Sequence, residues 1–216
     1  MRYRAVIFDL GGVVLGSPLH AIARYERHLG IPRDFINHVV VRTAPDGAWS
    51  RLERGELSME EFFPAFESDC QAAGHRISAR TMMDRMAEEA TPRASMLTAI
   101  ERIRERGLSV AALTNNWVGF EDNAGGREEG DQLLRSLFDV FVESSVEGLQ
   151  KPDPRIYRLA CERLGVEPRR AIFLDDIGRN LKPARELGLA TIKVVTPASA
   201  LSELEELLGF PVTDQD

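Results

Sequence analysis

Hydrophobic residues in this chain gather in short uninterrupted runs, each ending at glycine or at a polar residue. The first run lies within residues 3–14 and stops at the sequence Asp-Leu-Gly-Gly, which begins at Asp9. Continuous hydrophobicity bounded by a glycine turn is typical of a strand buried on both faces of a parallel sheet. The same signature predicts two further strands and, more weakly, two others: Leu108–Leu113 and Ala171–Leu174, then Val140–Val142 and Thr191–Val195.

Helical patterns separate these runs. Thr91 and Pro92 offer an N-cap and a first-turn proline to a helix whose apolar residues recur at helical spacing up to Gly107. Strands that alternate with helices across short links imply right-handed crossovers. The sequence therefore predicts an α/β fold with a doubly wound, Rossmann-like parallel sheet. The other predicted helices of this sheet are Pro154–Leu164, Asn180–Leu187 and Ser199–Leu208.

Residues 17–88 break the alternation, because they contain amphipathic stretches and no convincing strand. Ser58 and Glu61 form a capping-box pattern, in which each side chain satisfies a free backbone amide of the other residue. We predict a helical insertion after the first strand over residues 17–88, and a core domain made of residues 1–16 and 89–216. The amphipathic stretches are His20–Leu29, Arg33–Val41 and Ser58–Cys70, and the polar, glycine-rich segment Glu121–Gln132 predicts an exposed loop.

The composition is that of an ordinary soluble globular protein. Of the 216 residues, 44% are hydrophobic and 28% are charged, which suffices to build a buried core. The formal net charge of −7 argues against non-specific binding to nucleic acid, which needs cations facing phosphates. No apolar run approaches the roughly 18 residues of a membrane helix, and the amino terminus lacks the form of a secretory signal. We expect a cytoplasmic protein whose two cysteines, Cys70 and Cys161, are buried and reduced.

Polar residues that follow the predicted strands would meet at one edge of the sheet, where open parallel sheets bind their ligands. Each of these residues alone is common in turns and helix caps, but together they form a chemically coherent set. Gathered carboxylates repel one another unless a divalent cation binds them, and oxygen ligands favour Mg²⁺. Asp9 is then placed to attack phosphorus, while Lys151 and Thr114 stabilise the phosphoryl oxygens. The set comprises Asp9, Thr114 with Asn115, Lys151, and Asp175 with Asp176.

These residues stand in four segments that resemble the ordered motifs of the haloacid dehalogenase-like hydrolase superfamily. The resemblance spans nearly the whole chain and is closest to the amino-terminal phosphatase domain of soluble epoxide hydrolases and their bacterial relatives. It implies that the helical insertion is a cap, which closes over the site and selects a small phosphorylated substrate. The motif segments are Phe8–Val13, Leu113–Asn115, Lys151–Pro152 and Phe173–Asp176, and supporting strings occur at Arg54–Ser58, Lys151–Tyr157 and Phe173–Arg185.

The resemblance also implies a role for each matching residue. Asp9 matches the nucleophile, which would form a phospho-aspartyl intermediate during Mg²⁺-dependent hydrolysis of a small phosphomonoester. The implied catalytic residues are Asp9, Thr114 and Lys151; the implied phosphate-binding residues are Thr114, Asn115 and Lys151. The implied metal ligands are Asp9, the backbone carbonyl of Gly11, and Asp176, with Asp175 as a neighbouring ligand or supporting group.

Gly11 departs from the family pattern. Phosphatases of the superfamily usually carry an aspartate there, which protonates the leaving oxygen and later activates water. Loss of such a group typically costs about 10²–10⁴ in rate. Either a group from the cap, such as His20 or His38, or the substrate itself supplies the proton, or the leaving group needs little protonation.

Two other functions stay open at this stage: a metal-independent, dehalogenase-type hydrolase and a catalytically impaired phosphate-binding protein. We expect no nucleic-acid or membrane partner, and a monomer or a homodimer.

Overall fold

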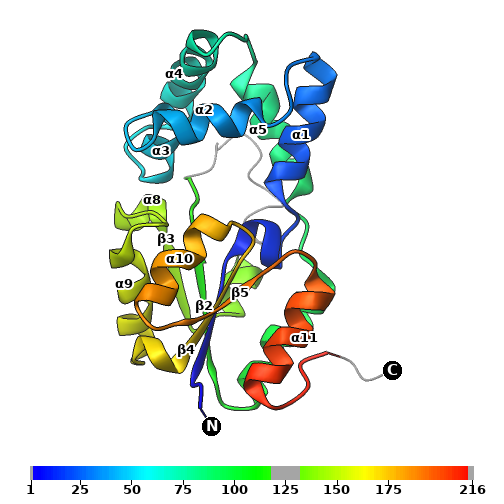
Figure 1. The fold of residues 1–216 in the computed structure, drawn as a ribbon, viewed down its shortest axis with the longest axis vertical. Helices are drawn as coiled ribbons and strands as arrows, with labels where there is room; N and C mark the ends of the chain where they lie inside the picture. The colour runs from blue at the N-terminus through cyan, green and yellow to red at the C-terminus, as the bar shows by residue number, and fades with distance from the viewer. Residues whose placement is uncertain (1, 118–131, 214–216) are drawn as a thin grey trace.

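Five parallel strands form the centre of the molecule (Figure 1). The structure is a computed structural model that describes residues 2–117 and 132–213. The strand order β3-β2-β1-β4-β5 places the first strand in the middle of the sheet, so the predicted doubly wound α/β fold is confirmed. The strands are β1 (Ala5–Phe8), β2 (Ser109–Thr114), β3 (Val140–Glu143), β4 (Ala171–Asp175) and β5 (Ala190–Lys193).

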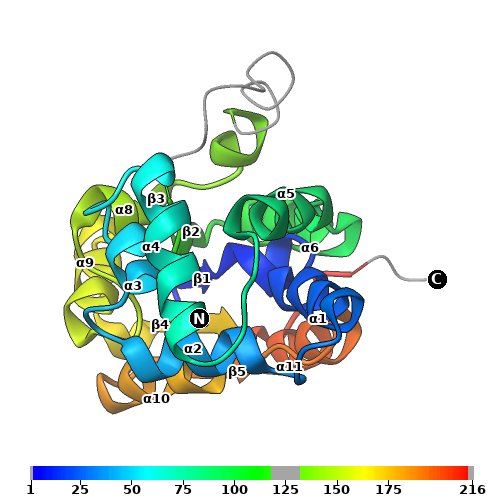
Figure 2. The ribbon, with the colours of Figure 1, turned by 90° about the horizontal axis from the view of Figure 1, so that it is seen from above.

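Helices cover both faces of the sheet, and the alternating side chains of β1 show why the strand is apolar throughout. Val6 and Phe8 pack into one hydrophobic cluster with helices α6 and α11. Ala5 and Ile7 point the other way, into a cluster formed with α9 and α10. The two layers are visible from above in Figure 2. These helices are α6 (Ala94–Glu105), α9 (Pro154–Leu164), α10 (Gly178–Glu186) and α11 (Pro197–Leu208).

Five consecutive helices lie beyond the carboxyl ends of the strands (Figure 1). They pack around a hydrophobic cluster of their own, in which Trp49 contacts Phe62 and Phe66 through their rings. The predicted capping box is present, with Ser58 and Glu61 bonded in both directions at the start of α4. The sequence pattern missed α3 and α5, and the exact limits of the helical insertion stay a prediction. The helices are α1 (Pro18–Leu29), α2 (Phe35–Thr43), α3 (Ala48–Glu53), α4 (Met59–Ala72) and α5 (Ala79–Glu89).

The predicted start of the helix after the insertion is wrong. Thr91 does not cap α6, which begins at Ala94 with Arg93 as its N-cap residue. The residues before it pair instead with the segment that leaves β1. The backbone amide of Gly16 donates to the carbonyl of Thr91 (3.0 Å), and that of Arg93 donates to the carbonyl of Val14 (2.9 Å). The two connections to the five helices therefore lie side by side.

Three further elements are short: a π-helical turn η1 (Leu10–Val14), α8 (Ser144–Glu147) and a 3₁₀ turn η3 (Pro168–Arg170). The predicted loop Glu121–Gln132 lies outside the described residues, apart from Gln132. Cys70 and Cys161 are both buried and unbonded, as expected. Within the part of the chain that the structure describes, no helix has the length and apolarity needed to cross a membrane.

Candidate active site

Asp9 lies directly after the central strand and is buried at its carboxyl end. Its Oδ1 accepts a hydrogen bond from the backbone amide of Leu10 (2.8 Å) and lies 2.8 Å from Lys151 Nζ. These two contacts fix one carboxylate oxygen in place at the start of η1. The chain then turns through Gly12, whose φ of +81° only glycine adopts without strain.

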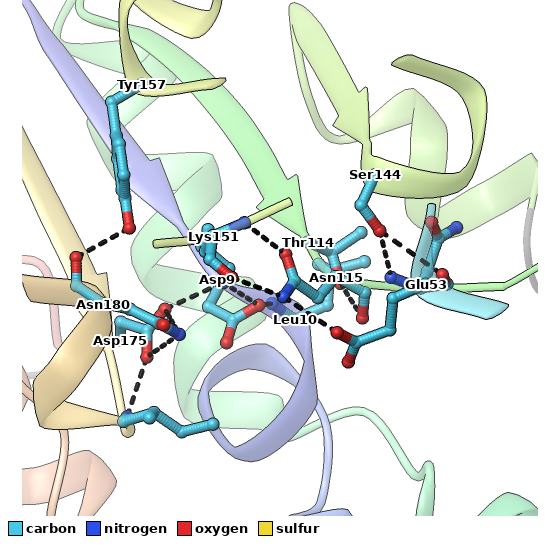
Figure 3. Close-up of polar contacts among 12 residues, drawn as sticks. Asp9, Leu10, Glu53, Thr114, Asn115, Ser144, Lys151, Tyr157, Asp175 and Asn180 are labelled. Atoms are coloured by element: carbon cyan, nitrogen blue, oxygen red, sulfur yellow. Dashed lines mark hydrogen bonds and ion pairs between the residues drawn. The ribbon is translucent and has the colours of Figure 1, made fainter. Parts of the chain in front are cut away.

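Lys151 is the cation at the centre of the site. Its side chain is only 1% exposed, and Nζ lies 2.8 Å from both Asp9 Oδ1 and Asp175 Oδ2 (Figure 3). Asn115 holds the backbone of Lys151 from the end of β2. Its Nδ2 donates to the Lys151 carbonyl (3.0 Å), and its Oδ1 accepts from the Lys151 amide (2.8 Å). The Asn115 side chain thus positions the lysine, and its predicted part in phosphate binding stays a prediction.

Asp175 and Asp176 are adjacent in the sequence but have different surroundings. Asp175 is fully buried and accepts hydrogen bonds from Lys151 Nζ, the Ile177 amide (2.7 Å) and Asn180 Nδ2 (3.0 and 3.1 Å). Asp176 lines the pocket above the sheet, and its Oδ1 is buried without a hydrogen-bond partner in the described structure. A buried carboxylate oxygen with no donor is costly unless something binds it. Asp176 is therefore the better candidate ligand, whereas Asp175 orients Lys151.

The electrostatics of the site favour an added cation. Burial, together with the nearby carboxylates of Asp175 and Asp176, raises the pKa of Asp9 to about 8, although Lys151 opposes the shift. Burial and the charge of Asp175 also raise the pKa of Asp176 to about 6. Burial lowers the pKa of Lys151, but attraction by Asp175 and Asp9 outweighs it, so the lysine stays charged. When ionised, the three carboxylates carry more negative charge than Lys151 alone neutralises.

The donor set fits a magnesium ion. Asp9, Asp175 and Asp176 each offer an oxygen, and these atoms lie within 4.8 Å of one another. Hard oxygen ligands in this number suit Mg²⁺, which keeps several of its waters. Gly12 leaves room for this arrangement, because an ideal Cβ at that position would lie 2.1 Å from Asp176 Oδ2. Gly11 lines the same pocket, and the metal-binding role of its carbonyl stays a prediction.

A pocket of about 660 Å³ connects the sheet edge to the helices above it. Thr114, buried at the end of β2, lines its floor together with Asp9 and Lys151. The structure therefore brings Asp9, Gly11, Thr114, Asn115, Lys151 and Asp176 around one cavity, as the parallel topology predicts. The wall formed by the five helices is largely apolar and includes Ile22, Ile36, Val40, Trp49, Met59, Phe63, Met83 and Met86.

Glu53 is a pocket residue that the sequence analysis missed. It ends α3 and faces the phosphate motif, where Asn115 Nδ2 donates to its Oε2 (3.3 Å). The available signal was its place directly before Arg54–Ser58, one of the strings that carry the family resemblance. By contrast, His20 and His38 are exposed, and neither is among the described residues that line the pocket.

The chain belongs to the haloacid dehalogenase-like hydrolases, since the model of that family matches residues 3–188. It is 42% identical over 213 residues to mouse acyl-CoA dehydrogenase family member 10, covering 97% of this chain and 20% of that protein. It is 38% identical to pig bifunctional epoxide hydrolase 2, covering 97% of this chain and 39% of the relative. The chain thus spans less than half the length of these two relatives. Sesquiterpene phosphatase astK of Aspergillus oryzae is 24% identical, with 96% of this chain and 97% of astK covered.

Solved structures share the same fold. A HAD-like hydrolase from Porphyromonas gingivalis superposes with a TM-score of 0.68 at 22% identity, covering 96% of this chain and 98% of that one. A HAD family enzyme from Bacteroides thetaiotaomicron, solved in complex with magnesium and inorganic phosphate, gives a TM-score of 0.59 at 20% identity. That match covers 88% of this chain and 93% of the Bacteroides chain. At these identities the likeness extends to the fold and no further.

Proposed function

We propose that this protein is a Mg²⁺-dependent phosphatase that hydrolyses a small phosphomonoester through a phosphorylated Asp9. The observation that carries the proposal is the contact of Lys151 with both Asp9 and Asp175, beside an Asp176 oxygen that has no partner. This set presents a nucleophile, a fixed cation and a carboxylate oxygen without a hydrogen-bond partner to a single pocket. Membership of the family of hydrolases supports the reaction class.

The reaction would begin with attack of Asp9 on phosphorus, which forms an aspartyl phosphate and releases the alcohol. Lys151 orients the Asp9 carboxylate and offsets the negative charge that develops on the transferring group. The Thr114 hydroxyl, at the end of β2, is placed to donate to a phosphoryl oxygen. Bound Mg²⁺, held by Asp9 and Asp176, would supply charge neutralisation to the phosphate. Water then cleaves the aspartyl phosphate and restores Asp9.

The pocket supports a substrate with an apolar organic group. The phosphate would lie against the polar floor, whereas the rest of the molecule would contact the apolar wall that includes Trp49, Phe63 and Met83. Burying apolar surface against this wall favours such substrates by roughly 25 cal/mol per Å². The similarity to a protein named sesquiterpene phosphatase agrees with this preference. We therefore propose apolar phosphomonoesters over sugar phosphates and nucleotides.

A phosphate-release screen tests the proposal directly. The purified protein is assayed against prenyl phosphates, sugar phosphates and nucleotides, with MgCl₂ or with excess EDTA. We expect Mg²⁺-dependent release, fastest from the prenyl esters and abolished by Asp9→Asn. Turnover of 2-chloropropionate in EDTA would instead support the dehalogenase alternative. Binding of beryllofluoride without steady-state phosphate release would support a phosphate-binding protein that has lost turnover.

A further inference from the structure

The proposed reaction needs a proton donor that position 11 does not supply. The backbone would accept a side chain there, because Gly11 has an ordinary φ of −65°. An added Cβ would meet only Pro18, at 3.5 Å. Neither the backbone nor the space around Cβ therefore excludes a side chain at position 11. For a substrate whose leaving oxygen needs a proton and that does not supply one itself, the acid is another group that reaches the pocket.

Among the residues that the structure describes, four carboxylates line the pocket besides Asp9 and Asp176. Asp84 and Glu88 are exposed on α5. Glu143 forms an ion pair with Arg135 through its Oε1 (2.7 Å), and the same oxygen accepts a hydrogen bond from Asn116 Nδ2 (2.7 Å). The fourth is Glu53.

Glu53 reaches from the helices above the sheet to the phosphate motif (Figure 3). Its Oε1 accepts from Trp49 Nε1 (2.9 Å), one turn earlier on α3. Its Oε2 accepts two longer bonds of 3.3 Å, from Asn115 Nδ2 and Gln150 Nε2. Since Asn115 directly follows Thr114 and also holds Lys151, this carboxyl group lies beside the place where the phosphoryl group would bind.

The surroundings of Glu53 favour its protonated form relative to that of an exposed glutamate. Burial raises the pKa of Glu53 above its usual value. The hydrogen bond from Trp49 and the charges of Arg179 and Lys151 oppose this shift without cancelling it. The guanidinium of the adjacent Arg54 pairs with Glu56 and donates to the carbonyl of Pro45 and to Gln150 Oε1 (3.2 Å).

We propose that Glu53 transfers the proton in this enzyme, taking the place of the aspartate that Gly11 replaces. The inference rests on the proposed phosphatase reaction. In the first step Asp9 bonds to phosphorus, the bond from phosphorus to the ester oxygen breaks, and the Glu53 carboxyl gives its proton to that oxygen. In the second step the Glu53 carboxylate takes a proton from the water that attacks the aspartyl phosphate. Phosphate leaves, and both Asp9 and protonated Glu53 are regenerated.

Leaving-group dependence tests this role, because only poor leaving groups need protonation. We compare kcat/KM for p-nitrophenyl phosphate with that for 2-phenylethyl phosphate, an ester of similar size whose alcohol is a far weaker acid. For Glu53→Gln we expect a loss of about 10²–10⁴ on the alkyl ester and less than about tenfold on the aryl ester. Glu60→Gln, at an exposed carboxylate of α4 that does not line the pocket, is the matched control and should change neither value.

Two further readouts separate proton transfer from a structural role. Glu53→Gln should remove the fall of alkyl-ester kcat/KM at alkaline pH, and it should give a burst of p-nitrophenol because the aspartyl phosphate accumulates. The double variant that carries both Gly11→Asp and Glu53→Gln should hydrolyse the alkyl ester at least tenfold faster than Glu53→Gln alone. If Glu53→Gln fails to fold by circular dichroism, Trp49→Phe serves instead. Loss of its N–H donor should move the alkaline fall to higher pH.

The outcomes also distinguish the two proposals. If the wild type hydrolyses p-nitrophenyl phosphate and Asp9→Asn does not, the phosphatase reaction stands independently of Glu53. Equal losses on the two esters in Glu53→Gln, or no loss, would then overturn the role of Glu53 alone. If Trp49→Phe is the variant used, an unchanged pH profile of alkyl-ester kcat/KM would likewise overturn the role of Glu53. A wild type that hydrolyses neither ester overturns both proposals together.

Discussion

Gly12 approaches Asp176 so closely that an ideal Cβ on Gly12 would lie 2.1 Å from Asp176 Oδ2. The close approach, together with the positive φ of Gly12, brings the turn after β1 against the end of β4. This contact between the ends of β1 and β4 places Asp9 and Asp176 at the same cavity.

Gly12→Ala should therefore damage both the fold and the site. We expect a loss of roughly 1–3 kcal/mol in the free energy of unfolding from backbone strain and displacement of Asp176, measured by urea denaturation. Phosphatase activity should fall with it. Gly11→Ala is the matched control, since Gly11 has a negative φ and its Cβ would make only ordinary contacts. A tolerated Gly12→Ala would contradict the tight packing of the turn.

Asp9→Asn should abolish turnover and leave the protein folded. Loss of the nucleophile should reduce kcat by on the order of 10⁴–10⁶. Because burial and two neighbouring carboxylates disfavour the charged form of Asp9, removal of its charge should not lower the melting temperature in EDTA. Phosphate release and thermal melting measure the two effects, with Asp46→Asn as a control at an exposed carboxylate outside the pocket. Activity equal to wild type would remove Asp9 from the mechanism.

Lys151→Met should destabilise the protein, because it leaves Asp9 and Asp175 buried without their shared cation. Removing one partner of a buried ion pair typically costs about 3–5 kcal/mol. The loss should be smaller at pH 5 than at pH 8, because the remaining carboxylates take up protons at low pH. Lys182→Met, at a side chain that is 81% exposed, should change the free energy of unfolding by less than about 0.5 kcal/mol. Similar losses in the two variants would argue against a central role for Lys151.

Magnesium should stabilise the protein, and the effect should grow with pH. The pKa values of Asp9 and Asp176 are raised from 3.8 to about 8 and about 6, so the folded state binds protons more tightly than the unfolded state. In EDTA, the contribution of these two groups to stability should therefore be fully present below about pH 4 and be lost as pH rises toward 8. MgCl₂ at 100 times its dissociation constant should add about 2.7 kcal/mol once these groups are ionised. Thermal melting in both buffers gives the comparison, and Asp176→Asn should lose the magnesium effect.

Gly11→Asp should raise turnover of poor leaving groups in the otherwise wild-type protein. The backbone at position 11 and the space around an added Cβ accept a side chain, and a carboxylate there would offer a second route for the proton. We expect an increase of up to about tenfold in kcat for 2-phenylethyl phosphate, since Glu53 already supplies part of this function. An unchanged rate would indicate that proton transfer does not limit the reaction.

The fold class was predictable from the sequence because the signals for strands and turns lie in short stretches of neighbouring residues. The strands read as continuous apolar runs, since both faces of each are covered by helices. Parallel topology then brings the residues after these runs to one edge of the sheet, so Asp9, Thr114 and Asp176 could be grouped before any coordinates were known. The helix start at Thr91 was mispredicted because the residues around it pair across the chain, with the segment leaving β1.

The roles of Asp175 and Asp176 were not predictable, because the two residues are chemically identical neighbours. In the folded chain Asp175 accepts hydrogen bonds from Lys151 and Asn180, whereas Asp176 lines the pocket. Glu53 was not predicted as a site residue for a related reason. The helix α3 is only 6 residues long, too short for a periodic pattern to reveal it, and its partners Asn115 and Gln150 lie far away in the sequence.

The sequence by itself determined the order of strands and helices, the four motif segments and the absence of a side chain at position 11. Only the tertiary structure decided which carboxylate faces the cation and which faces the cavity, and that a glutamate from the inserted helices reaches the phosphate motif. The physical reason is that hydrophobic periodicity and turn residues act on neighbouring positions. Burial, hydrogen bonding and charge act between residues that meet only after the chain has folded.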